Sequence, residues 1–349
     1  MASAACVYQA ISESEKLKGE IGNMNPPTVS VIIPSYNAAD LVVKAIKSVL
    51  TQDFAGIEVL VVDDGSTDGT AQLVGETFSD PRVRLLQHPD GKNHGVCASR
   101  RLALTIASGE YVAFLDADDY YLPDKFTRHV AILEKHPEAV LVHGTIVFSS
   151  IPGAEDQGPF TFPMPDGIFE YDCLGFGNFL LGCHICNSTV VCRRRALHFT
   201  DLPHSLAFQI EDWLLWTYIA GRGTFIYDKI PLTVYNANPQ GYTYTQLKHP
   251  GRNHLAHLEY LTALLAKPPQ GVSRKKICDA LTVAFENLLD VKKQHWKDIE
   301  ESDPSAPPAR AWLWPLGCSI HFRLLKHWFR VGTAPARRAI RKIIPKKTI

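Results

Sequence analysis

The sequence has no uninterrupted apolar run of about 18 residues, the length that a membrane-spanning helix needs, so we expect no such helix. It begins without a charged segment followed by an apolar one, and we expect residues 1–27 to form a polar tail instead of a signal peptide. The eight cysteines are scattered over 349 residues, which favours a reducing compartment over a disulfide framework. These absences predict a cytoplasmic protein.

Acidic residues are missing from the C-terminal segment. From Arg310 to the end the chain has ten Lys or Arg residues and no Asp or Glu, although its formal net charge is +0. Because the whole chain has 36 basic residues, the preceding part keeps 26 of them against all 36 acidic ones. A basic tail on an acidic body indicates that the tail has a partner of its own.

Motifs of several enzyme classes are missing as well. No Gly-x-Gly-x-x-Gly follows the first expected strand, which argues against a dinucleotide-dependent oxidoreductase. No glycine-rich phosphate loop near the N-terminus supports a sugar-phosphate nucleotidyltransferase, and no Gly-x-Ser-x-Gly elbow indicates a serine nucleophile. The sequence therefore gives no support to these three kinds of chemistry.

Strand and helix patterns alternate through the first half of the chain. Apolar, β-branched runs predict strands at 29–33, 58–62, 83–86 and 111–115, the first ended by Pro34. Helices are expected between them, with Asp40 capping the first, around 73–78 for the second and over 96–107 for the third. Alternating strands and helices predict an α/β fold with a mostly parallel sheet covered on both faces.

The second half of the chain is less regular. A Pro- and Gly-rich excursion is expected at 151–165 and a linker at 303–308. An apolar, β-branched stretch resumes at 187–193, and helices are expected over 211–220, 255–265 and 277–291.

The expected strand ends carry polar and aromatic side chains. They read Pro34-Ser-Tyr-Asn37 after the first strand, Asp63-Asp64 after the second and Asp116-Ala-Asp-Asp119 after the fourth. Ligands of parallel α/β sheets bind beyond the carboxyl ends of the strands, so these residues are expected to line one crevice. Asp, Asn and Gly also favour turns, and any one of these segments alone is compatible with a plain turn. All three together favour a site.

Three segments resemble the inverting glycosyltransferases of family 2. They are Val29-Ser-Val-Ile-Ile-Pro-Ser-Tyr-Asn37, Val61-Val-Asp-Asp-Gly-Ser-Thr-Asp-Gly69 and Gly109-Glu-Tyr-Val-Ala-Phe-Leu-Asp-Ala-Asp-Asp119. The similarity continues more weakly through Asn187–Val191 and Glu211–Trp213 to about Tyr235. It implies a GT-A fold, which is α/β and Rossmann-like with a mostly parallel central sheet and flanking helices. The helical patterns after it predict a C-terminal helical extension. We therefore expect a tail at 1–27, a GT-A domain at 28–245, a helical extension at 246–300 and a linker with a basic amphipathic segment at 301–349.

The resemblance implies a donor site for a nucleotide-sugar. Tyr36 would lie against the nucleobase, Asp64 would accept a hydrogen bond from it, and Arg100 would lie near the diphosphate. The implied donor-binding set is Pro34, Tyr36, Asn37, Asp64, Arg100, Asp116 and Ala117.

The resemblance also implies a metal ion and a base. Charge that develops on a diphosphate leaving group is commonly stabilised by a divalent cation, and Mg²⁺ or Mn²⁺ prefers oxygen ligands. Asp118 would ligate the metal directly, with Asp116 nearer the ribose or the metal shell. Asp212 would deprotonate the acceptor hydroxyl for a single in-line displacement, which inverts the anomeric carbon.

Each of these roles has a plainer alternative. Asp212 suits the first turn of a helix because acids there interact well with the helix dipole. Tyr36 fits ordinary core packing, and Arg100 fits a solvated helix surface. A non-catalytic nucleotide-sugar-binding scaffold also remains open as an alternative function.

Some features depart from the family or stand apart from it. Arg101 occupies a position where many relatives have Asn, and nothing in the sequence accounts for it. No Gln-x-x-Arg-Trp follows Asp212, which favours addition of one sugar over polymerisation. Cys183-His-Ile-Cys186 lacks a second ligand pair, so a buried thiol role is favoured over zinc.

The C-terminal segment suits a membrane surface. A helix over 320–331 would place basic side chains on one face and aromatic ones opposite, as in helices that lie on anionic lipid. A terminal helix docked on the domain is the alternative, and no nucleic-acid recognition module accompanies the charge. We expect a UDP-sugar donor, a polysaccharide or lipid-linked acceptor, and a protein on the cytoplasmic face of the membrane.

Overall fold

The computed structural model describes residues 28–149, 167–169, 179–180, 183, 185–198, 201, 210–236, 250–284 and 287. The chain divides into two compact units, Met1–Gly241 and Tyr242–Ile349, and each is described by itself. The expected tail at 1–27, the excursion at 151–165 and the basic segment at 301–349 lie outside the described residues, so the predictions made for them stay predictions.

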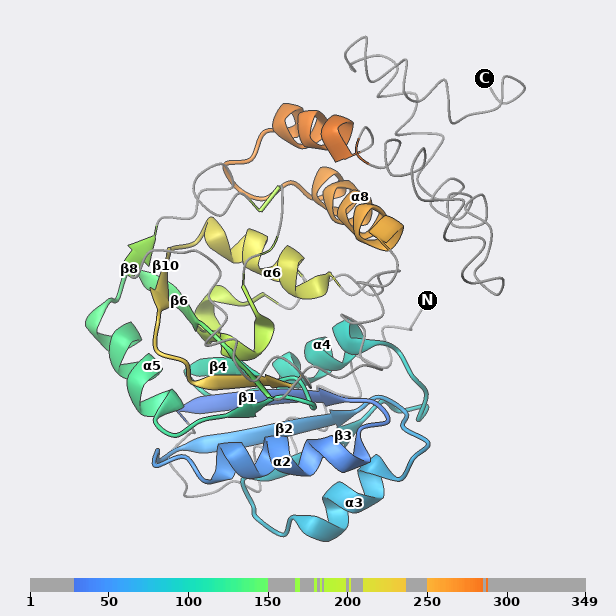
Figure 1. Ribbon diagram of the computed structural model, residues 1–349, viewed down its shortest axis with the longest axis vertical. Coiled ribbons are helices and arrows are strands. Elements are labelled where there is room, and N and C mark those ends of the chain that lie inside the picture. Colours follow the sequence, from blue (N-terminus) through green and yellow to red (C-terminus); the bar gives the residue numbers. More distant parts are fainter. Residues whose placement is uncertain are drawn as a thin grey trace. The chain divides into compact units, whose positions relative to one another are not determined.

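An eight-stranded sheet organises the first unit (Figure 1). Its strands are β1 (Val29–Ser35), β2 (Ile57–Asp63), β3 (Val83–Gln87), β4 (Tyr111–Phe114), β6 (Ala139–Gly144), β8 (Gly167–Phe169), β9 (Val191–Arg193) and β10 (Thr224–Asp228). They lie in the order β3-β2-β1-β4-β9-β6-β10-β8. The four strands predicted from the first half are parallel neighbours, as expected. β9 runs antiparallel between β4 and β6, and β8 runs antiparallel along β10.

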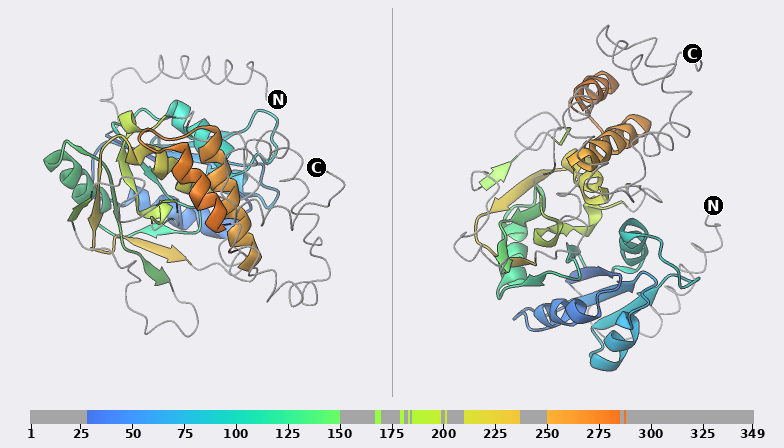
Figure 2. Two further views of the ribbon diagram at one scale, coloured as in Figure 1. Left: turned by 90° about the horizontal axis from the view of Figure 1, so that it is seen from above. Right: turned by 45° about the vertical axis from the view of Figure 1, so that its right-hand side comes forward.

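Helices cover both faces of this sheet, which confirms the predicted layering (Figures 1 and 2). On one face the core includes side chains of α2 (Ala39–Leu50), α3 (Thr70–Thr77) and α5 (Lys125–Lys135). On the other face it includes side chains of α4 (Val96–Ile106) and α6 (Glu211–Ala220). The α6 bounds are those predicted from the sequence.

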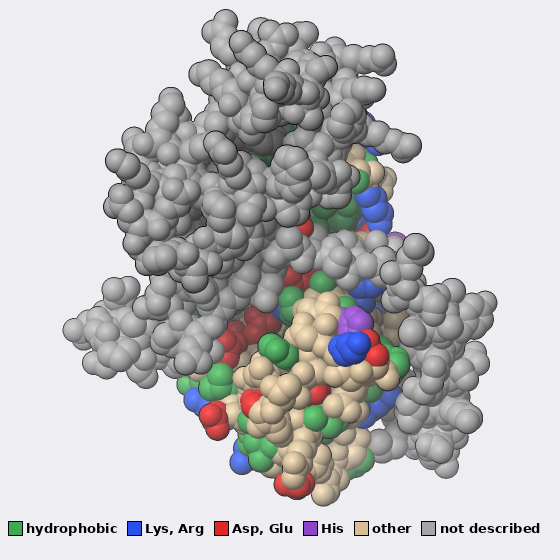
Figure 3. Space-filling view, turned by 90° about the vertical axis from the view of Figure 1, so that its right-hand side faces the viewer, with side chains coloured by type: hydrophobic (Ala, Val, Ile, Leu, Met, Phe, Trp, Pro, Cys, Tyr) green, Lys and Arg blue, Asp and Glu red, His purple; other side chains and the backbone are tan. Residues whose placement is uncertain are grey.

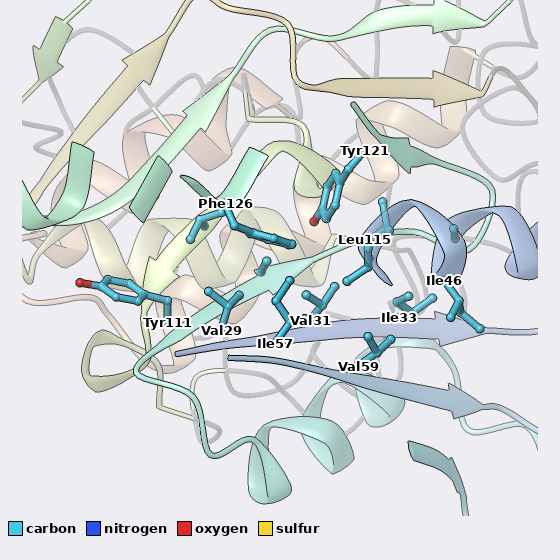
Figure 4. Close-up of a cluster of buried hydrophobic side chains, with 14 of the residues drawn as sticks. Val29, Val31, Ile33, Ile46, Ile57, Val59, Tyr111, Leu115, Tyr121 and Phe126 are labelled. Atoms are coloured by element: carbon cyan, nitrogen blue, oxygen red, sulfur yellow. The ribbon is translucent and has the colours of Figure 1, made fainter. Parts of the chain in front are cut away.

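β1 is buried on both sides, which explains its continuous apolar run. Val29, Val31 and Ile33 point into the cluster that contains Ile46 of α2 (Figure 4). Ile32, between them, belongs to the cluster on the opposite face. Alternation along a strand therefore sends successive side chains into two separate cores, and both must be apolar.

The end of β1 differs from the prediction. Pro34 does not end the strand, because β1 continues through Pro34, opposite Val62, to Ser35. The pairing of β1 with β4 stops at Ile32 and Phe114, so the missing N–H of Pro34 lies beyond that ladder.

The predicted cap of α2 is also wrong. The helix begins at Ala39 after the capping position Ala38, and Asp40 lies inside the first turn. The amide of Ala39 donates instead to Asp68 Oδ2 at 3.1 Å, and that of Ala38 donates to Thr70 Oγ1 at 3.0 Å. Asp68 and Thr70, which follow β2, therefore supply the acceptors that a residue next to the helix start would otherwise have given.

A three-stranded sheet of β5 (Tyr120–Tyr121), β11 (Thr233–Asn236) and β7 (Val147–Ser149) completes the described part of the first unit. The 3-10 helices η1 (Asn187–Thr189) and η2 (Arg194–Ala196) flank β9. The second unit contains α8 (Pro250–Ala266) and a helix at 274–284, where helices were predicted. Within the described ranges, no helix has the length and apolar character needed to cross a membrane.

Candidate functional site

The ends of β1, β2 and β4 lie side by side at one edge of the sheet. Ser35 of β1 pairs in register with Asp63 of β2, and β4 flanks β1 on the other side. The three segments predicted to line a crevice are therefore neighbours. Acidic side chains lie together on the face that Figure 3 shows, in red.

The turn after β1 is held by the turn after β2. Asn37, in the left-handed conformation with φ 48°, accepts the amide of Thr67 through Oδ1 at 2.8 Å. Its own amide donates to Ser66 Oγ at 2.9 Å. Between these anchors Tyr36 is 52% exposed, so the alternative that its ring packs in a core is wrong. An exposed ring on a fixed turn is a surface on which a base can stack.

Asp64 organises the loop that leads into α4. Its carboxylate accepts the backbone amides of His94 and Gly95, each at 2.8 Å, and lies 3.2 Å from His88 Nε2. Burial acts to raise the pKa of Asp64, but the hydrogen bonds from His88, His94 and Gly95 outweigh it and the net pKa is lowered. Asp64 is therefore an ionised acceptor at neutral pH, and its predicted contact with a nucleobase stays a prediction.

The loops around Asp64 approach each other closely. A side chain at Gly65, where φ is +73°, would come within 2.6 Å of the backbone N of Asn93. Only glycine fits this position, because a Cβ there has neither the space nor the favoured backbone conformation.

Arg100 connects two distant parts of the site. It lies on α4 with 4% of its side chain exposed, donates to Asp116 Oδ1 at 2.7 Å and forms an ion pair with Glu211. The alternative of a solvated helix residue is therefore wrong. Burial acts to lower the pKa of the guanidinium, but the nearby carboxylates of Glu211, Asp116 and Asp212 raise it. Arg100 is permanently charged and joins the end of β4 to the start of α6.

The Asp116–Asp119 loop is held by η1 and β11. The side-chain amide Nδ2 of Asn187 donates to Asp116 Oδ1 at 3.1 Å. Ser188 Oγ donates to Asp119 Oδ2 at 2.5 Å and accepts the backbone N–H of Asp116 at 3.1 Å. The amide of Asn236 donates to Asp119 Oδ1 at 2.9 Å. The loop is thus fixed at both ends, with buried Ala117 and the half-buried Asp118 between them.

The two carboxylates predicted to hold a metal repel each other. Burial, and then the charge of Asp116, raise the pKa of Asp118 to about 6. A divalent cation with a preference for oxygen ligands would relieve this repulsion, so the residues present fit Mg²⁺ or Mn²⁺.

The protein alone supplies only part of a metal shell. Within the part of the chain that the structure describes, no group of three or more His, Cys, Asp or Glu side chains could hold a metal ion. A cation at Asp118 would therefore complete its shell with water and donor phosphate oxygens, as Mg²⁺ commonly does. Cys183 and Cys186 are free thiols, and the described residues around them form no group of the size that a zinc site requires.

Asp212 has the electrostatic character of a proton acceptor. It lies in the first turn of α6, as the plainer alternative had it, but it is next to the buried Arg100–Glu211 pair. Burial, and then the charge of Glu211, raise the pKa of Asp212 to about 7. A carboxylate with that pKa can take up a proton near neutral pH. Trp213 anchors the turn by donating its indole N–H to the carbonyl of Phe179 at 2.7 Å.

Sequence patterns did not indicate every residue that builds the site. Asn187 and Ser188 lie in a weakly matching segment, and their only signal was polar residues just before a strand. Glu211 was recognised as the neighbour of Asp212, but nothing in the sequence pointed to its pairing with Arg100. These contacts join residues that are 71, 72 and 111 positions apart.

Comparison with known sequences finds glycosyltransferases. Residues 30–187 match the family model described as glycosyl transferase family 2. The chain is 34% identical over 194 residues to the Escherichia coli UDP-Glc:alpha-D-GlcNAc-diphosphoundecaprenol beta-1,3-glucosyltransferase WfgD, a match that covers 55% of this chain and 70% of WfgD. It is 30% identical over 203 residues to an uncharacterized glycosyltransferase of Rickettsia conorii, covering 58% of this chain. The chain spans only 31% of that longer relative.

Comparison with solved structures shows the same fold. S. aureus TarS 1-349 in complex with UDP-GlcNAc superposes with a TM-score of 0.58 at 18% identity, covering 83% of this chain and 80% of that one. The mannosyltransferase PcManGT from Pyrobaculum calidifontis, in complex with GDP-Man and Mn²⁺, superposes with a TM-score of 0.51 at 19% identity, covering 97% and 95%. The predicted GT-A architecture is thereby confirmed.

Proposed function

The chain belongs to glycosyltransferase family 2, and we propose that it transfers one sugar from a nucleotide-sugar to a polysaccharide or lipid-linked acceptor, with inversion at the anomeric carbon. The observation that carries this proposal is the Arg100 bridge, which holds Asp116 from the end of β4 beside Glu211 at the start of α6. Through this bridge Asp116, which is proposed for donor binding, lies in one acidic cluster with Glu211 and the neighbouring Asp212, which is proposed for proton transfer. The missing Gln-x-x-Arg-Trp motif supports a single addition.

Tyr36 and Asp64 are the residues proposed to recognise the nucleobase. The exposed ring of Tyr36 offers a stacking surface, and ionised Asp64 offers an acceptor for a base N–H. A uridine nucleotide is favoured because WfgD is named for UDP-Glc and the TarS structure contains UDP-GlcNAc.

Asp118, with Asp116 beside it, would hold the divalent cation. When bound, Mg²⁺ or Mn²⁺ stabilises the negative charge that develops on the diphosphate leaving group. The chain's own part is to present two oxygen ligands on a fixed loop, close enough together that a cation lowers their repulsion. The Mn²⁺ in the PcManGT complex supports this choice of metal.

Asp212 is proposed as the general base. It would take the proton from the acceptor hydroxyl as the oxygen attacks the anomeric carbon and the nucleoside diphosphate leaves. Because the base must be ionised and its pKa is about 7, the transfer rate is expected to rise as the pH increases through 7.

The test is donor binding and turnover in matched proteins. UDP-sugars with Mn²⁺ are expected to raise the melting temperature of the wild type and of Asp212→Asn alike, since both keep the donor site. Transfer by Asp212→Asn is expected to fall by about 10²- to 10⁴-fold. Binding without turnover in the wild type would favour the non-catalytic scaffold, and no stabilisation by any nucleotide with Mn²⁺ present would refute the donor site.

A lipid-linked acceptor would place the protein at a membrane. The acceptor in the name of WfgD is a diphosphoundecaprenol, and the segment after Arg310 in this chain is basic without acidic residues. We propose that this segment, which lies outside the described residues, contacts anionic lipid on the cytoplasmic face. Vesicles with phosphatidylglycerol are expected to co-sediment the protein, while neutral vesicles do not. Equal binding after Arg337, Arg338, Arg341 and Lys342 are all changed to Gln would refute this contact.

A further inference from the structure

The 3-10 helix η1 contacts both ends of the Asp116–Asp119 loop through the hydroxyl of Ser188. Ser188 is fully buried, donates to Asp119 Oδ2 at 2.5 Å and accepts the N–H of Asp116 at 3.1 Å. A serine hydroxyl has a single hydrogen to donate, and here that hydrogen goes to the loop. Ser188 thus bridges the first and last residues of the acidic loop.

Asn187 acts on the same loop from the neighbouring position. It donates to Asp116 Oδ1, and Arg100 donates to that same oxygen at 2.7 Å. Both of these contacts are made to Oδ1, so together they fix the orientation of the Asp116 carboxylate.

The position of η1 is itself fixed from two other elements. Thr233 of β11 donates its hydroxyl to the carbonyl of Ser188 at 3.2 Å. Lys125 of α5 donates its ammonium to the carbonyl of Thr189 at 2.5 Å. Lys125 and Thr233 are both buried, and burying an ammonium costs free energy unless it is hydrogen-bonded. The turn is therefore a rigid support for the loop it contacts.

We propose that Ser188 and Asn187 are positioning residues of the donor site. Ser188 ties the backbone N–H of Asp116 to the carboxylate of Asp119, and Asn187 holds the carboxylate of Asp116. Together they would fix the backbone on either side of Asp118 and present Asp118 to a divalent cation and a diphosphate. This inference rests on the proposed function, because it requires a nucleotide that binds with a metal. Residues that orient ligand side chains commonly affect metal affinity without touching the metal.

The test compares two variants of the full-length chain that each lose one buried hydroxyl from η1. Ser188→Ala removes the contacts to Asp116 and Asp119. Thr189→Val is the matched control, because the equally buried Thr189 hydroxyl donates only to the carbonyl of Cys186, at 2.7 Å, among the described contacts of that group. Calorimetric titration measures UDP affinity with and without Mn²⁺, and circular dichroism verifies folding.

Ser188→Ala is expected to bind UDP without Mn²⁺ as the wild type does. The Mn²⁺ concentration that half-saturates the metal-dependent gain in UDP affinity is expected to rise roughly 10- to 100-fold, and Thr189→Val is expected to match the wild type. If Ser188→Ala does not fold, the same measurement on Asn187→Ala, which removes the contact to Asp116, decides the point.

Three results would overturn the inference. They are an unchanged Mn²⁺ requirement in folded Ser188→Ala or Asn187→Ala, an equal loss of UDP affinity with and without Mn²⁺, and an equal effect of Thr189→Val. If the wild type binds UDP and Mn²⁺, any one of these results overturns the positioning role of Ser188 and Asn187 and leaves the proposed function standing. A wild type that binds no nucleotide under either condition overturns the proposed function and this inference together.

Discussion

At the scale of single residues, the carboxylates of the site differ because their neighbours differ. Asp64 accepts hydrogen bonds from two backbone amides and a histidine, and its pKa is lowered. Asp118 is half-buried beside Asp116, and burial and the charge of Asp116 raise its pKa to about 6. Ionised Asp118 is therefore unfavourable in the ligand-free protein, although the proposed metal site requires that charge. A residue that lowers stability while serving a ligand is expected at a binding site.

Asp118→Asn is expected to stabilise the ligand-free protein. The pKa of Asp118 is raised from 3.8 in the unfolded chain to about 6 in the folded one, so its ionisation opposes folding increasingly from pH 4 and fully above pH 6. Removing the charge should therefore raise the unfolding free energy at pH 7.5 by about 1 to 2 kcal/mol, allowing for solvent screening, with no gain at pH 4. Urea unfolding at both pH values measures the effect.

The matched control for this prediction is Asp53→Asn. Asp53 is an exposed aspartate in the turn after α2, and its replacement should leave the unfolding free energy unchanged at both pH values. Asp118→Asn should at the same time lose the stabilisation that UDP and Mn²⁺ give together. A variant that is no more stable than the wild type at pH 7.5 would contradict the burial and repulsion argued for Asp118.

At the scale of the secondary-structure elements, α2 depends on the turn that follows β2. The capping position is occupied by Ala38, which has no side-chain acceptor, and Asp68 accepts the amide of Ala39. Asp68 also accepts the amide and the hydroxyl of Thr70, so one carboxylate orders the starts of α2 and α3. The same region carries Tyr36 and Asn37, so the start of the helix and the proposed nucleobase side of the site depend on the same contacts.

Asp68→Ala is expected to lower the unfolding free energy by about 1 kcal/mol, the usual cost of a lost helix cap. Asp40→Ala is the matched control, because Asp40 lies in the first turn of the same helix and makes no cap contact in the structure. Thermal unfolding of both variants measures the difference. Equal destabilisation by the two substitutions would show that charge near the helix start matters and that the contact from Asp68 does not.

Helix and strand positions could be predicted from local patterns, but their connections could not. The apolar periodicity indicated α6 at 211–220 and the strands β1 to β4 within one or two residues, because those signals lie within each element. The cap from Asp68 escaped prediction because its acceptor lies 29 residues from the amide it binds. The sequence placed the cap at Asp40, the nearest suitable residue, since a local rule has no means of finding a distant partner.

At the scale of the whole first unit, the order of the strands determines the site. β9 lies between β4 and β6 although it follows β4 by almost 80 residues in the sequence, and it carries η1 to the Asp116–Asp119 loop. The sequence resemblance predicts Asp116, Asp118 and Asp212 as site residues. The supporting contacts of Arg100, Asn187 and Ser188 follow only from the chain topology, which no pattern along the sequence contains.

A buried polar cluster beside the sheet connects this unit's stability to pH. His129 of α5 is fully buried, with Nε2 3.5 Å from Asp228 Oδ2, and Lys125, Arg128 and His143 are its charged or titratable neighbours. Burial, and then the charge of Lys125, lower the pKa of His129 to about 3. His143 is buried in the same way, and its pKa is also lowered to about 3. Both histidines are therefore neutral in the folded protein at every pH where it is expected to work.

Acidification is expected to destabilise the molecule through these histidines. A histidine whose folded pKa lies below its unfolded value of about 6.5 binds a proton on unfolding, so its contribution to stability is present above pH 6.5 and is lost as the pH falls. Each such histidine should lower the unfolding free energy by about 2 kcal/mol between pH 6.5 and 5.

His129→Gln should remove the part of this pH dependence that His129 contributes. His136→Gln, at a partly exposed histidine, should keep the full wild-type dependence. Urea unfolding at pH 7 and pH 5 separates the two variants, and an equal loss in His129→Gln and wild type would mean that His129 is not held neutral in the core.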